Sequence, residues 1–362
     1  MAQALSRYLS LTGITLILSY LWSATLASTN GGPIHVKSGQ SIQAAINAAQ
    51  SGARIIVEAG TYHEQLTITS NGINLIGRGA VLVPPSIPVN NTCSGLAGPD
   101  TEAGICVTGL NVELAPFDVE HRRFISVVQP VKDVLIAGFE VRNFGSNVAV
   151  VGGKDIQILN NHLANGDAYG CLILGSSDSK VESNTVMSTD ALRFIAICND
   201  ASPGIHISTN HVSGYVVGLC IQTPDADIQH NDVVNSCIGA FVDPNIDGAK
   251  IRNNHISNAN TTCALVGDGT IDGVLIYGAS NTLVEQNVIE TLSAGGVPGK
   301  YGIGITIADF TTGSSVTLAS DNHVAGNTLR NNDLDIFISS NGTGNVVEGN
   351  QCSTPAELCT RV

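Results

Sequence analysis

Ile158-Leu-Asn-Asn161-His-Leu163 is the first full copy of a six-residue pattern that sets the fold of this chain. The pattern reads apolar residue, two variable residues, Asn, one variable residue, apolar residue. It returns around Asn184, Asn210, Asn231 and Asn254, where the asparagines are 23, 26, 21 and 23 residues apart, and again around Asn287, Asn327 and Asn350. A period of ~20–30 residues in a chain rich in glycine and β-branched residues indicates a solenoid, in which each repeat forms one coil.

Stacking of the coils gives the repeated asparagines a structural explanation. Equivalent residues in successive coils lie ~4.8 Å apart, which is the spacing of neighbouring strands. An asparagine at each corner can adopt or adjoin a left-handed backbone conformation, and its amide can pair with the asparagines above and below it. Such pairing satisfies polar groups whose burial would otherwise cost free energy. We therefore interpret these asparagines as structural rather than catalytic.

The composition agrees with many short strands in one elongated domain. The 362 residues include 39 glycines and only 4% aromatic residues, and glycine with Val, Ile and Asn is typical of strands joined by turns. Helical periodicity is confined to residues 41–50, where apolar residues recur at i, i+3, i+4 and i+7 from Ile42 and Ser41 can cap the helix. We expect this helix to cover the open end of the solenoid.

Residues 1–27 have the pattern of a secretory signal peptide. Arg7 provides a positive charge, an apolar run follows it, and small residues precede a cleavage position near Ala27. A membrane anchor is the alternative, but the run is short for a bilayer span. We therefore expect residues 28–362 to be a secreted, extracellular domain with no membrane contact.

Two segments within residues 28–362 depart from the repeat. Residues 84–127 contain three prolines near their start and several glycines, and we expect a long loop insertion there. Residues 344–362 are expected to form a C-terminal segment closed by a disulfide.

Cysteines and sequons fit an oxidising, extracellular compartment. Close spacing predicts disulfides Cys93–Cys106 and Cys352–Cys359, and similar places in successive coils predict Cys237–Cys263. The count of nine is odd, so at least one thiol stays free, and Cys171, Cys198 and Cys220 are expected as buried thiols. Sequons make Asn90, Asn260 and Asn341 candidate glycosylation sites.

The formal net charge of −14 restricts the partners of the chain. Without a basic stripe that could neutralise phosphates, nucleic acid is not expected as a partner. The same charge opposes unaided binding of an acidic polymer, although a divalent cation could offset it. We expect a monomer.

The N-terminal sequence resembles that of a known family. Ser41-Ile-Gln-Ala-Ala-Ile46, Ile55-Ile-Val-Glu-Ala-Gly-Thr-Tyr-His-Glu64 and Ile73-Asn-Leu-Ile-Gly-Arg-Gly79 are similar to the opening of right-handed parallel β-helix proteins of the pectate-lyase-like (pectin lyase-like) superfamily. The Asn-centred coils resemble its repeats. The resemblance implies an all-β fold, a single-stranded right-handed parallel β-helix of about nine or ten coils. It implies little about function, because this fold hosts many activities.

Acidic residues follow several of the expected strands. Asp200, Asp225, Asp243, Asp268 and Asp309 each come after an apolar run. Coil stacking would place them in a column with a spacing of ~5 Å, where carboxylates could raise one another's pKa or hold a cation. A preference of turns for Asp explains each residue singly, so the hypothesis depends on the column as a whole.

The segment Asp243-Pro-Asn-Ile-Asp247 suggests calcium or catalysis. Its spacing matches the start of a calcium loop but lacks the acid at the twelfth position, so any Ca²⁺ would bind to Asp243 and Asp247 with oxygens from neighbouring coils. Phe241-Val-Asp-Pro-Asn245 is similar to the Tyr/Phe-x-Asp-Pro-His motif of β-helical mannuronan C5-epimerases, with Asn245 in place of His, and Asp268 could match their second acid. The resemblance of Asn245-Ile-Asp247 to polygalacturonases lacks that family's partner motifs, and we reject it.

Further polar residues complete the list of candidates. Lys250 and Arg193 are candidate catalytic residues, because a lyase needs a base and a group that neutralises a carboxylate. The candidate substrate-binding residues are Tyr169, Tyr215, Tyr301, Asp200, Asp225 and Gln222.

These observations predict a secreted, carbohydrate-active β-helix protein that binds an extracellular polysaccharide along the acidic edge. The expected reaction is that of a lyase or C5-epimerase on a uronic-acid polymer, with Asp243 and Asp268 central and either no cofactor or Ca²⁺. The alternative is a non-catalytic cell-wall or glycan-binding protein.

Overall fold

The structure is a computed structural model that describes residues 32–189, 192–265 and 271–360. The expected signal peptide at 1–27 and the candidate Asp268 lie outside the described residues. Among the described residues, no helix has the length and apolarity needed to cross a bilayer.

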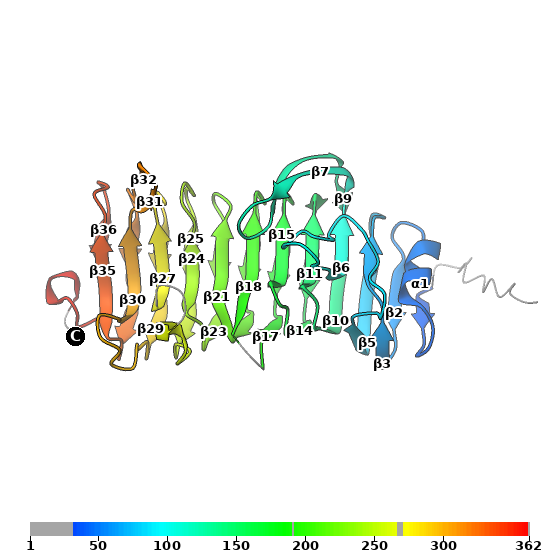
Figure 1. The fold of residues 1–362 in the computed structure, drawn as a ribbon, viewed down its shortest axis with the longest axis horizontal. Coiled ribbons are helices and arrows are strands. Elements are labelled where there is room, and N and C mark those ends of the chain that lie inside the picture. The colour runs from blue at the N-terminus through cyan, green and yellow to red at the C-terminus, as the bar shows by residue number, and fades with distance from the viewer. Residues whose placement is uncertain (1–31, 190–191, 266–270, 361–362) are drawn as a thin grey trace, which may run out of the picture.

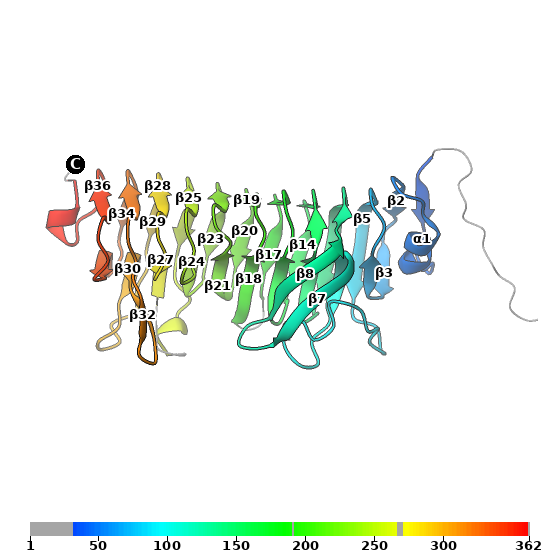
Figure 2. The same ribbon diagram turned by 90° about the horizontal axis from the view of Figure 1, so that it is seen from above.

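The chain winds into one long solenoid of parallel strands (Figures 1 and 2). Each regular coil has one longer strand, a turn, a short strand, the Asn corner and a second short strand. In the coil that contains Asn184 these strands are β15 (Tyr169–Leu174), β16 (Lys180–Glu182) and β17 (Thr185–Met187). This arrangement confirms the predicted parallel β-helix with its Asn corner between the second and third strands.

The longer strands form a ten-stranded parallel sheet, called here the long-strand sheet. In spatial order it comprises β4 (Leu66–Ile68), β6 (Ala103–Thr108), β11 (Ser146–Val151), β15, β18 (Arg193–Asp200), β21 (Tyr215–Gln222), β24 (Ile238–Val242), β27 (Ile271–Tyr277), β30 (Gly302–Ala308) and β35 (Leu334–Ser339).

The short strands form the other two faces of the solenoid. Strands before the corner are β1 (Ile34–Val36), β2 (Arg54–Val57), β13 (Gln157–Leu159), β16, β19 (His206–Ser208), β22 (Asp227–Gln229), β25 (Lys250–Arg252), β28 (Leu283–Glu285), β33 (His323–Ala325) and β36 (Val346–Glu348). Strands after the corner are β3 (Gly60–His63), β14 (His162–Ala164), β17, β20 (His211–Ser213), β23 (Asp232–Val234), β26 (His255–Ser257), β29 (Val288–Glu290) and β34 (Thr328–Arg330). Strands β5 (Asn74–Val83) and β10 (Leu135–Arg142) run through the corner.

Apolar residues at matching positions of successive coils build the core. Ile158, Val181, Ile207, Ile228 and Ile251 are paired in register and none is exposed to solvent. Each is the middle residue of a three-residue strand whose neighbours point outward. Burial of each such side chain contributes ~1.5–3 kcal/mol, and the same pattern repeated in every coil fixes the register.

The corner asparagines form a continuous buried ladder from Asn161 to Asn350. The Oδ1 of Asn210 accepts hydrogen bonds from both the backbone N–H and the Nδ2 of Asn184, at 2.9 and 3.0 Å. Its own Nδ2 donates to the Oδ1 of Asn231 and to the carbonyl of Val181, at 3.0 and 2.8 Å. The same bonds join the later pairs through Asn254, Asn287, Asn327 and Asn350.

The left-handed conformation belongs to the residue before each ladder asparagine. Ser183 and Thr209 have φ of 56° and 54°, whereas Asn184 and Asn210 have no positive φ. A left-handed residue turns the chain, and the buried asparagine that follows then ties adjacent coils together.

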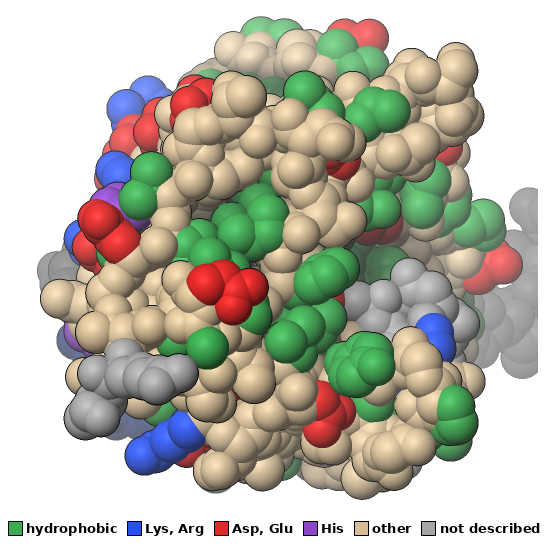
Figure 3. All heavy atoms as spheres, turned by 90° about the vertical axis from the view of Figure 1, so that its left-hand side faces the viewer, with side chains coloured by type: hydrophobic (Ala, Val, Ile, Leu, Met, Phe, Trp, Pro, Cys, Tyr) green, Lys and Arg blue, Asp and Glu red, His purple; other side chains and the backbone are tan. Residues whose placement is uncertain are grey.

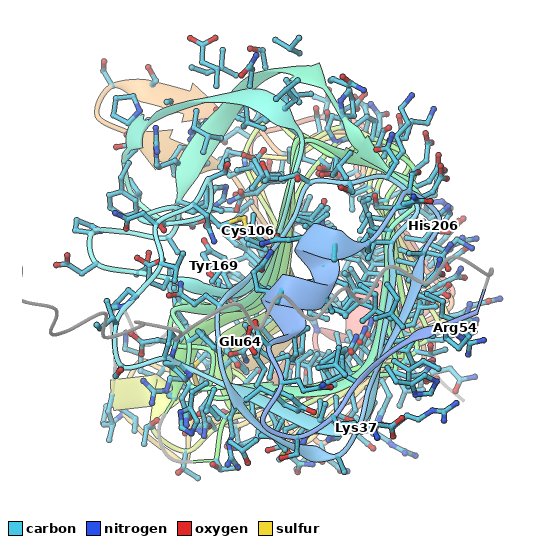
Figure 4. The ribbon with its side chains drawn as sticks, turned by 90° about the vertical axis from the view of Figure 1, so that its right-hand side faces the viewer. Lys37, Arg54, Glu64, Cys106, Tyr169 and His206 are labelled. Carbon is cyan, nitrogen blue, oxygen red and sulfur yellow. A yellow bond between two sulfur atoms is a disulfide. The ribbon has the colours of Figure 1, made fainter. Side chains whose placement is uncertain are left out.

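The N-terminal helix is confirmed as α1 (Ile42–Ala48), and it covers the first coils of the solenoid. Ser41 caps it by accepting a hydrogen bond from the backbone N–H of Ala44 at 3.1 Å. The Glu64 carboxylate accepts from the N–H groups of Ile42 and Gln43, at 2.9 and 3.0 Å. Figure 4 shows Glu64 beside this helix, with Cys106 and Tyr169 across the solenoid from Arg54 and His206.

Residues 84–127, expected as a loop insertion, contain a strand of the long-strand sheet and most of an antiparallel hairpin. The strand is β6, and the hairpin consists of β7 (Leu110–Phe117) and β8 (Arg122–Gln129). Figures 1 and 2 show the hairpin folded over the outer face of the solenoid. A second hairpin consists of β31 (Phe310–Thr312) and β32 (Ser315–Thr317). The remaining elements are the strands β9 (Val131–Lys132) and β12 (Gly153–Lys154) and the short 3-10 helices η1 (Cys263–Leu265) and η2 (Ala356–Leu358).

Four disulfides are present in the structure. Three are the pairs predicted from spacing, Cys93–Cys106, Cys237–Cys263 and Cys352–Cys359. The fourth, Cys198–Cys220, corrects the expectation that these two cysteines are buried thiols. Cys198 on β18 and Cys220 on β21 are directly paired in register. The sequence of either strand alone does not give this register. Cys171 is the buried free cysteine.

A C-terminal segment is attached to the last coil by Asp335. One carboxylate oxygen of this buried residue accepts hydrogen bonds from the backbone N–H groups of Ser353 and Thr354, at 2.8 and 3.2 Å, and from both hydroxyls. The exposed apolar residues Phe337 and Ile338 lie on β35 in this last coil. Figure 3 views this end of the molecule and shows apolar side chains interspersed with polar surface.

Substitution of Asp335 by Ala is expected to release this segment without unfolding the solenoid. Four donors lose their acceptor, which should weaken local attachment by ~2–3 kcal/mol. Hydrogen exchange of residues 351–360 should accelerate by on the order of 10-fold or more, while exchange in β15 to β24 stays unchanged. Glu348→Ala, an exposed acid on β36, is the control. Unchanged exchange at Ser353 and Thr354 would contradict this role for Asp335.

Candidate active site

A row of polar side chains lies along the outer face of the long-strand sheet, where the strands end. Asp200 on β18 is in register with Gln222 on β21. The register of β21 with β24 and of β24 with β27 extends the row to Asp243 and then to Tyr277. Alternation along each strand sends the preceding apolar side chains into the core and these polar ones outward.

The tip of the β7–β8 hairpin folds over this row. Glu120 and His121 lie in the turn and Arg123 lies at the start of β8. The amide nitrogen of Gln222 donates to the Glu120 carboxylate at 2.8 Å, although 102 residues separate them in sequence. Hairpin and sheet thus enclose a cavity of about 420 Å³. Its lining residues are Asp118, Val119, Glu120, His121, Arg123, Asp200, Gln222, Phe241, Asp243, Pro244, Asn245, Ile246, Tyr277 and Phe310.

Asp243 has a strongly perturbed pKa. Burial raises the pKa of its carboxyl group from 3.8 to about 7, and the nearby negative charges of Glu120 and Asp200 add to the rise. The Gln222 amide and the Arg123 guanidinium oppose it by stabilising the carboxylate. Half-buried between two other acids, Asp243 therefore carries a proton at neutral pH in a large fraction of molecules, as a general acid requires.

His121 connects the hairpin tip to two strands. Its Nε2 lies 3.3 Å from Asp200 Oδ2 and its Nδ1 lies 2.9 Å from the Tyr169 hydroxyl. His121 therefore links β15 to β18 through the Tyr169 hydroxyl and the Asp200 carboxylate. Burial, followed by the charges of the surrounding acids, raises the pKa of Tyr169, which keeps this hydroxyl protonated.

Aromatic rings form the opposite side of the cavity. Phe241 and Tyr277 have ring centroids 6.2 Å apart, and Phe310 meets Tyr277 edge to face at 5.2 Å. Both separations lie in the range favoured by aromatic pairs. The cavity thus combines an acidic side with an apolar, aromatic side.

One group of three potential metal ligands exists among the described residues, and it lies in this cavity. Carboxylate oxygens of Glu120 and Asp243 and the sulfur of Cys220 lie within 4.8 Å of one another. Cys220 is bonded to Cys198 and supplies no thiolate. Two carboxylates therefore remain, a set that suits a hard cation better than a soft one.

Several residues predicted from sequence meet in or beside this cavity. Asp243, Asn245, Asp200 and Gln222 line it. Tyr169 is buried directly behind it and contacts His121.

Other predicted residues lie elsewhere. Arg193 starts β18 at the end away from Asp200 and pairs with Asp167. Lys250 is exposed on β25, and Tyr301 is 58% exposed in the loop before β30. Tyr215 is buried at the start of β21. None of these four lines the cavity.

The turn acids do not form one column. Asp225 and Asp247 are exposed and stacked in successive turns, where the N–H of Asp225 donates to the carbonyl of Asp247. Asp247 accepts hydrogen bonds from Ser280 and Asn281 and is not a lining residue of the cavity. The carboxylate of Asp309 accepts hydrogen bonds from the backbone N–H groups of Ala319 and Asn341. The turns differ in length, so acids at similar sequence offsets point in different directions.

Sequence reasoning missed the hairpin tip and the aromatic side. Glu120, His121 and Arg123 belong to no repeat, and their partners are about 50–100 residues away. The cluster of polar and charged residues at 118–123, between two apolar strands, is the one available signal. Phe310 likewise lies in a hairpin outside the coils.

Comparison with known proteins supports the fold. The model of the family "Periplasmic copper-binding protein (NosD)" matches residues 118–271, which is less than half of the chain. A search of curated proteins finds no match. The solved structures that resemble this one are β-helix proteins. The chain shares the parallel β-helix fold of these solved structures.

Three solved β-helix structures illustrate the similarity. DFA-IIIase from Arthrobacter chlorophenolicus A6, solved without its lid, has a TM-score of 0.58 at 11% identity, covering 85% of this chain and 86% of its own. The A-module of mannuronan C-5 epimerase from Azotobacter vinelandii has a TM-score of 0.51 at 16% identity, covering 87% and 93%. Alginate lyase from a Paenibacillus species has a TM-score of 0.53 at 13% identity, covering 85% and 99%. At these identities the similarity concerns the fold alone.

Proposed function

We propose that this protein is a carbohydrate-active enzyme that cleaves or transfers a glycosidic bond of a neutral glycan, with Asp243 and Glu120 as the acid and the nucleophile. The observation that carries the proposal is the pair itself, with carboxylate oxygens within 4.8 Å in an enclosed cavity. Glycosidases use two flanking carboxyl groups, and a separation of ~5–5.5 Å belongs to the retaining class.

We propose a separate step for each carboxyl group. Asp243, which holds a proton near pH 7, donates it to the leaving oxygen as the glycosidic C–O bond breaks. Glu120, whose carboxylate accepts from Gln222, forms a bond to the anomeric carbon. Asp243, now ionised, takes a proton from the water or sugar hydroxyl that displaces Glu120, and both groups return to their starting states.

The charge of the cavity favours a neutral sugar. Asp118, Glu120 and Asp200 line the cavity with Asp243, whereas Arg123 is the one arginine or lysine among its described lining residues. Burial, with the charges of Glu120 and Asp200, raises the pKa of Asp243, and a further carboxylate on the substrate would be repelled by the same acids. The rings of Phe241, Tyr277 and Phe310 offer apolar surface to the C–H face of a sugar.

The fold comparisons support carbohydrate chemistry in general terms. Similar solved structures carry names that include an exopolygalacturonase, a C-5 epimerase and an alginate lyase. We further propose that the protein acts outside the cytoplasm, since four disulfides and the word periplasmic in the name of the matched family fit such a compartment.

A lyase or C5-epimerase acting on a uronic acid is the second candidate, and Arg123 is the observation that favours it. A guanidinium in the cavity could neutralise the substrate carboxylate, and the hydrogen-bonded pair of His121 and Tyr169 could move the proton at C5.

Copper chemistry, suggested by the name of the matched family, finds less support. The cavity offers carboxylates, a disulfide sulfur and one histidine engaged on both ring nitrogens.

One screen separates these functions. The protein would be incubated with neutral glycans (inulin, levan, arabinan, mixed-linkage β-glucan) and with alginate and pectate. New reducing ends without an unsaturated product are expected from a neutral glycan, and NMR should show retention at the anomeric carbon. Ultraviolet absorption of an unsaturated uronate would favour the lyase instead.

Substitution of Glu120 by Gln should lower the rate of neutral-glycan turnover by on the order of 10³-fold or more. The amide keeps the size of the side chain but is a poor nucleophile. Asp321→Asn is the matched control, because Asp321 is an exposed turn residue with φ of 56°, a conformation that Asn tolerates. Full activity of Glu120→Gln, or a folded protein that binds glycans without changing any of them, would refute the proposed chemistry.

A further inference from the structure

We infer that the cavity takes the end of a saccharide chain, or a short oligosaccharide, and excludes the interior of a long polymer. This inference rests on the proposed function and specifies its substrate class. It follows from two hairpins that close the outer face of the long-strand sheet on both sides of Asp243.

The body of the β7–β8 hairpin, away from the cavity at its tip, packs directly on the sheet. A Cβ placed on Gly175 would meet the ring of Phe124 at 2.2 Å, and one placed on Gly109 would meet the side chain of Val127 at 2.5 Å. Contact this close fills the outer face from β6 to β15. A polysaccharide bound at Asp243 cannot continue along the strand ladder toward the N-terminal end.

The hairpin tip is anchored over three neighbouring strands. His121, 5% exposed, bonds to Tyr169 on β15 and to Asp200 on β18. Glu120 accepts from Gln222 on β21. A backbone hydrogen bond also holds the hairpin tip, since the N–H of Arg122 donates to the carbonyl of Leu96 at 2.8 Å. Displacing the tip would expose or orphan several of these groups, so it behaves as a fixed wall.

The β31–β32 hairpin forms a second wall on the C-terminal side. Phe310 packs edge to face on Tyr277. A Cβ on Gly278 would meet Phe310 Cβ at 2.9 Å and the carbonyl oxygen of Thr317 at 3.0 Å, so this hairpin is also close to the sheet. Figures 1 and 2 show both hairpins projecting from the same side of the solenoid, with β21 and β24 between them.

The space between the walls is short. From β18 to β27 there are three strand spacings, or roughly 14 Å. The cavity has a volume of about 420 Å³. An internal segment of a polymer would have to leave through both walls, whereas a chain end enters with only one exit toward solvent.

Product analysis tests the inference on the most active neutral glycan of the screen. Early products should be short saccharides of one size, while the viscosity of the polymer falls slowly relative to the release of reducing ends. Phe310→Ala, which lowers the C-terminal wall, should broaden the product sizes. A ladder of mid-sized products with a rapid loss of viscosity would overturn the inference but leave the glycosidase proposal intact.

Binding provides a second test that needs no turnover. The Asp243→Asn protein would be titrated with inulin fractions of increasing chain length. If chain ends bind, the half-saturating concentration is constant when expressed in chain ends. If it is constant instead when expressed in sugar residues, internal segments bind and the inference fails. If the protein neither binds nor converts any glycan of the screen, both the proposed function and this inference are refuted.

Discussion

Substitution of Asp243 by Asn is expected to lower turnover of a glycan by on the order of 10²–10⁴-fold, the usual contribution of a positioned general acid. Asn keeps the shape of the side chain but has no acidic proton for the leaving oxygen. In the parent protein, activity should fall as pH rises through about 7, because Asp243 then loses that proton. Rates measured with a fixed glycan from pH 5 to pH 9 would show the descending limb.

The same substitution is expected to stabilise the fold at high pH. The pKa of Asp243 is higher in the folded protein than its ordinary value of 3.8, so the folded state holds a proton that the unfolded state has lost between about pH 4 and pH 7. Stability therefore decreases as pH rises across that interval, and the full cost of the buried charge persists above it. Asn avoids this cost. Allowing for partial solvent access, the gain should be on the order of 2 kcal/mol at pH 8 and near zero at pH 4.

Thermal unfolding of the two proteins at both pH values measures this effect. The Asp321→Asn protein should match the parent in melting temperature and in activity at each pH. A catalytic acid in a costly position should lose activity and gain stability together, whereas a purely structural acid should lose stability. If the parent and Asp243→Asn have equal melting temperatures at pH 8 and equal turnover, Asp243 is not a catalytic residue.

The repeated pattern predicted the coils because it reflects contacts between residues at a fixed sequence offset. Every apolar-x-x-Asn unit buries its apolar residue and its Asn against the same residues of the next coil, so the period carries the information. Even Phe139, which takes the corner position before the first ladder Asn, donates its N–H to Asn161 as a later Asn would. The helix at Ser41 was equally local, since its cap and its apolar face lie within one short segment.

The site could be predicted only in part because it joins a repeat to a non-repeat. Asp243, Gln222 and Asp200 follow strands and were found as polar residues after apolar runs. Glu120 and His121 lie in a hairpin whose docking depends on close contact between Phe124 and Gly175. No local pattern encodes such a contact. The direction of Asp247, which was predicted with Asp243 to bind calcium, depends in the same way on hydrogen bonds from Ser280 and Asn281 in the next coil.

Substitution of Asn231 by Ala is expected to destabilise the solenoid by about 3–5 kcal/mol, the largest stability effect anticipated for one residue of the ladder. The Oδ1 of Asn231 accepts from the N–H and the Nδ2 of Asn210, and its Nδ2 donates to the carbonyl of Ile207 and the Oδ1 of Asn254. Alanine removes all four of these hydrogen bonds from a buried corner of the solenoid. The residue is 1% exposed, which limits replacement of the lost bonds by water.

The position in the ladder should decide the size of the effect. Asn350 ends the ladder, so Asn350→Ala removes three side-chain hydrogen bonds, whereas Asn231→Ala removes four. Denaturant unfolding, monitored by circular dichroism, should therefore give a much lower free energy of unfolding for Asn231→Ala than for Asn350→Ala. Gln229→Ala, on the partly exposed side of β22, should have a free energy of unfolding close to that of the parent. Equal losses at Asn231 and Asn350 would mean that each amide acts only within its own coil. The ranked order would instead show that stability passes from coil to coil through the stacked amides, as nearest-neighbour coupling in a repeat protein requires.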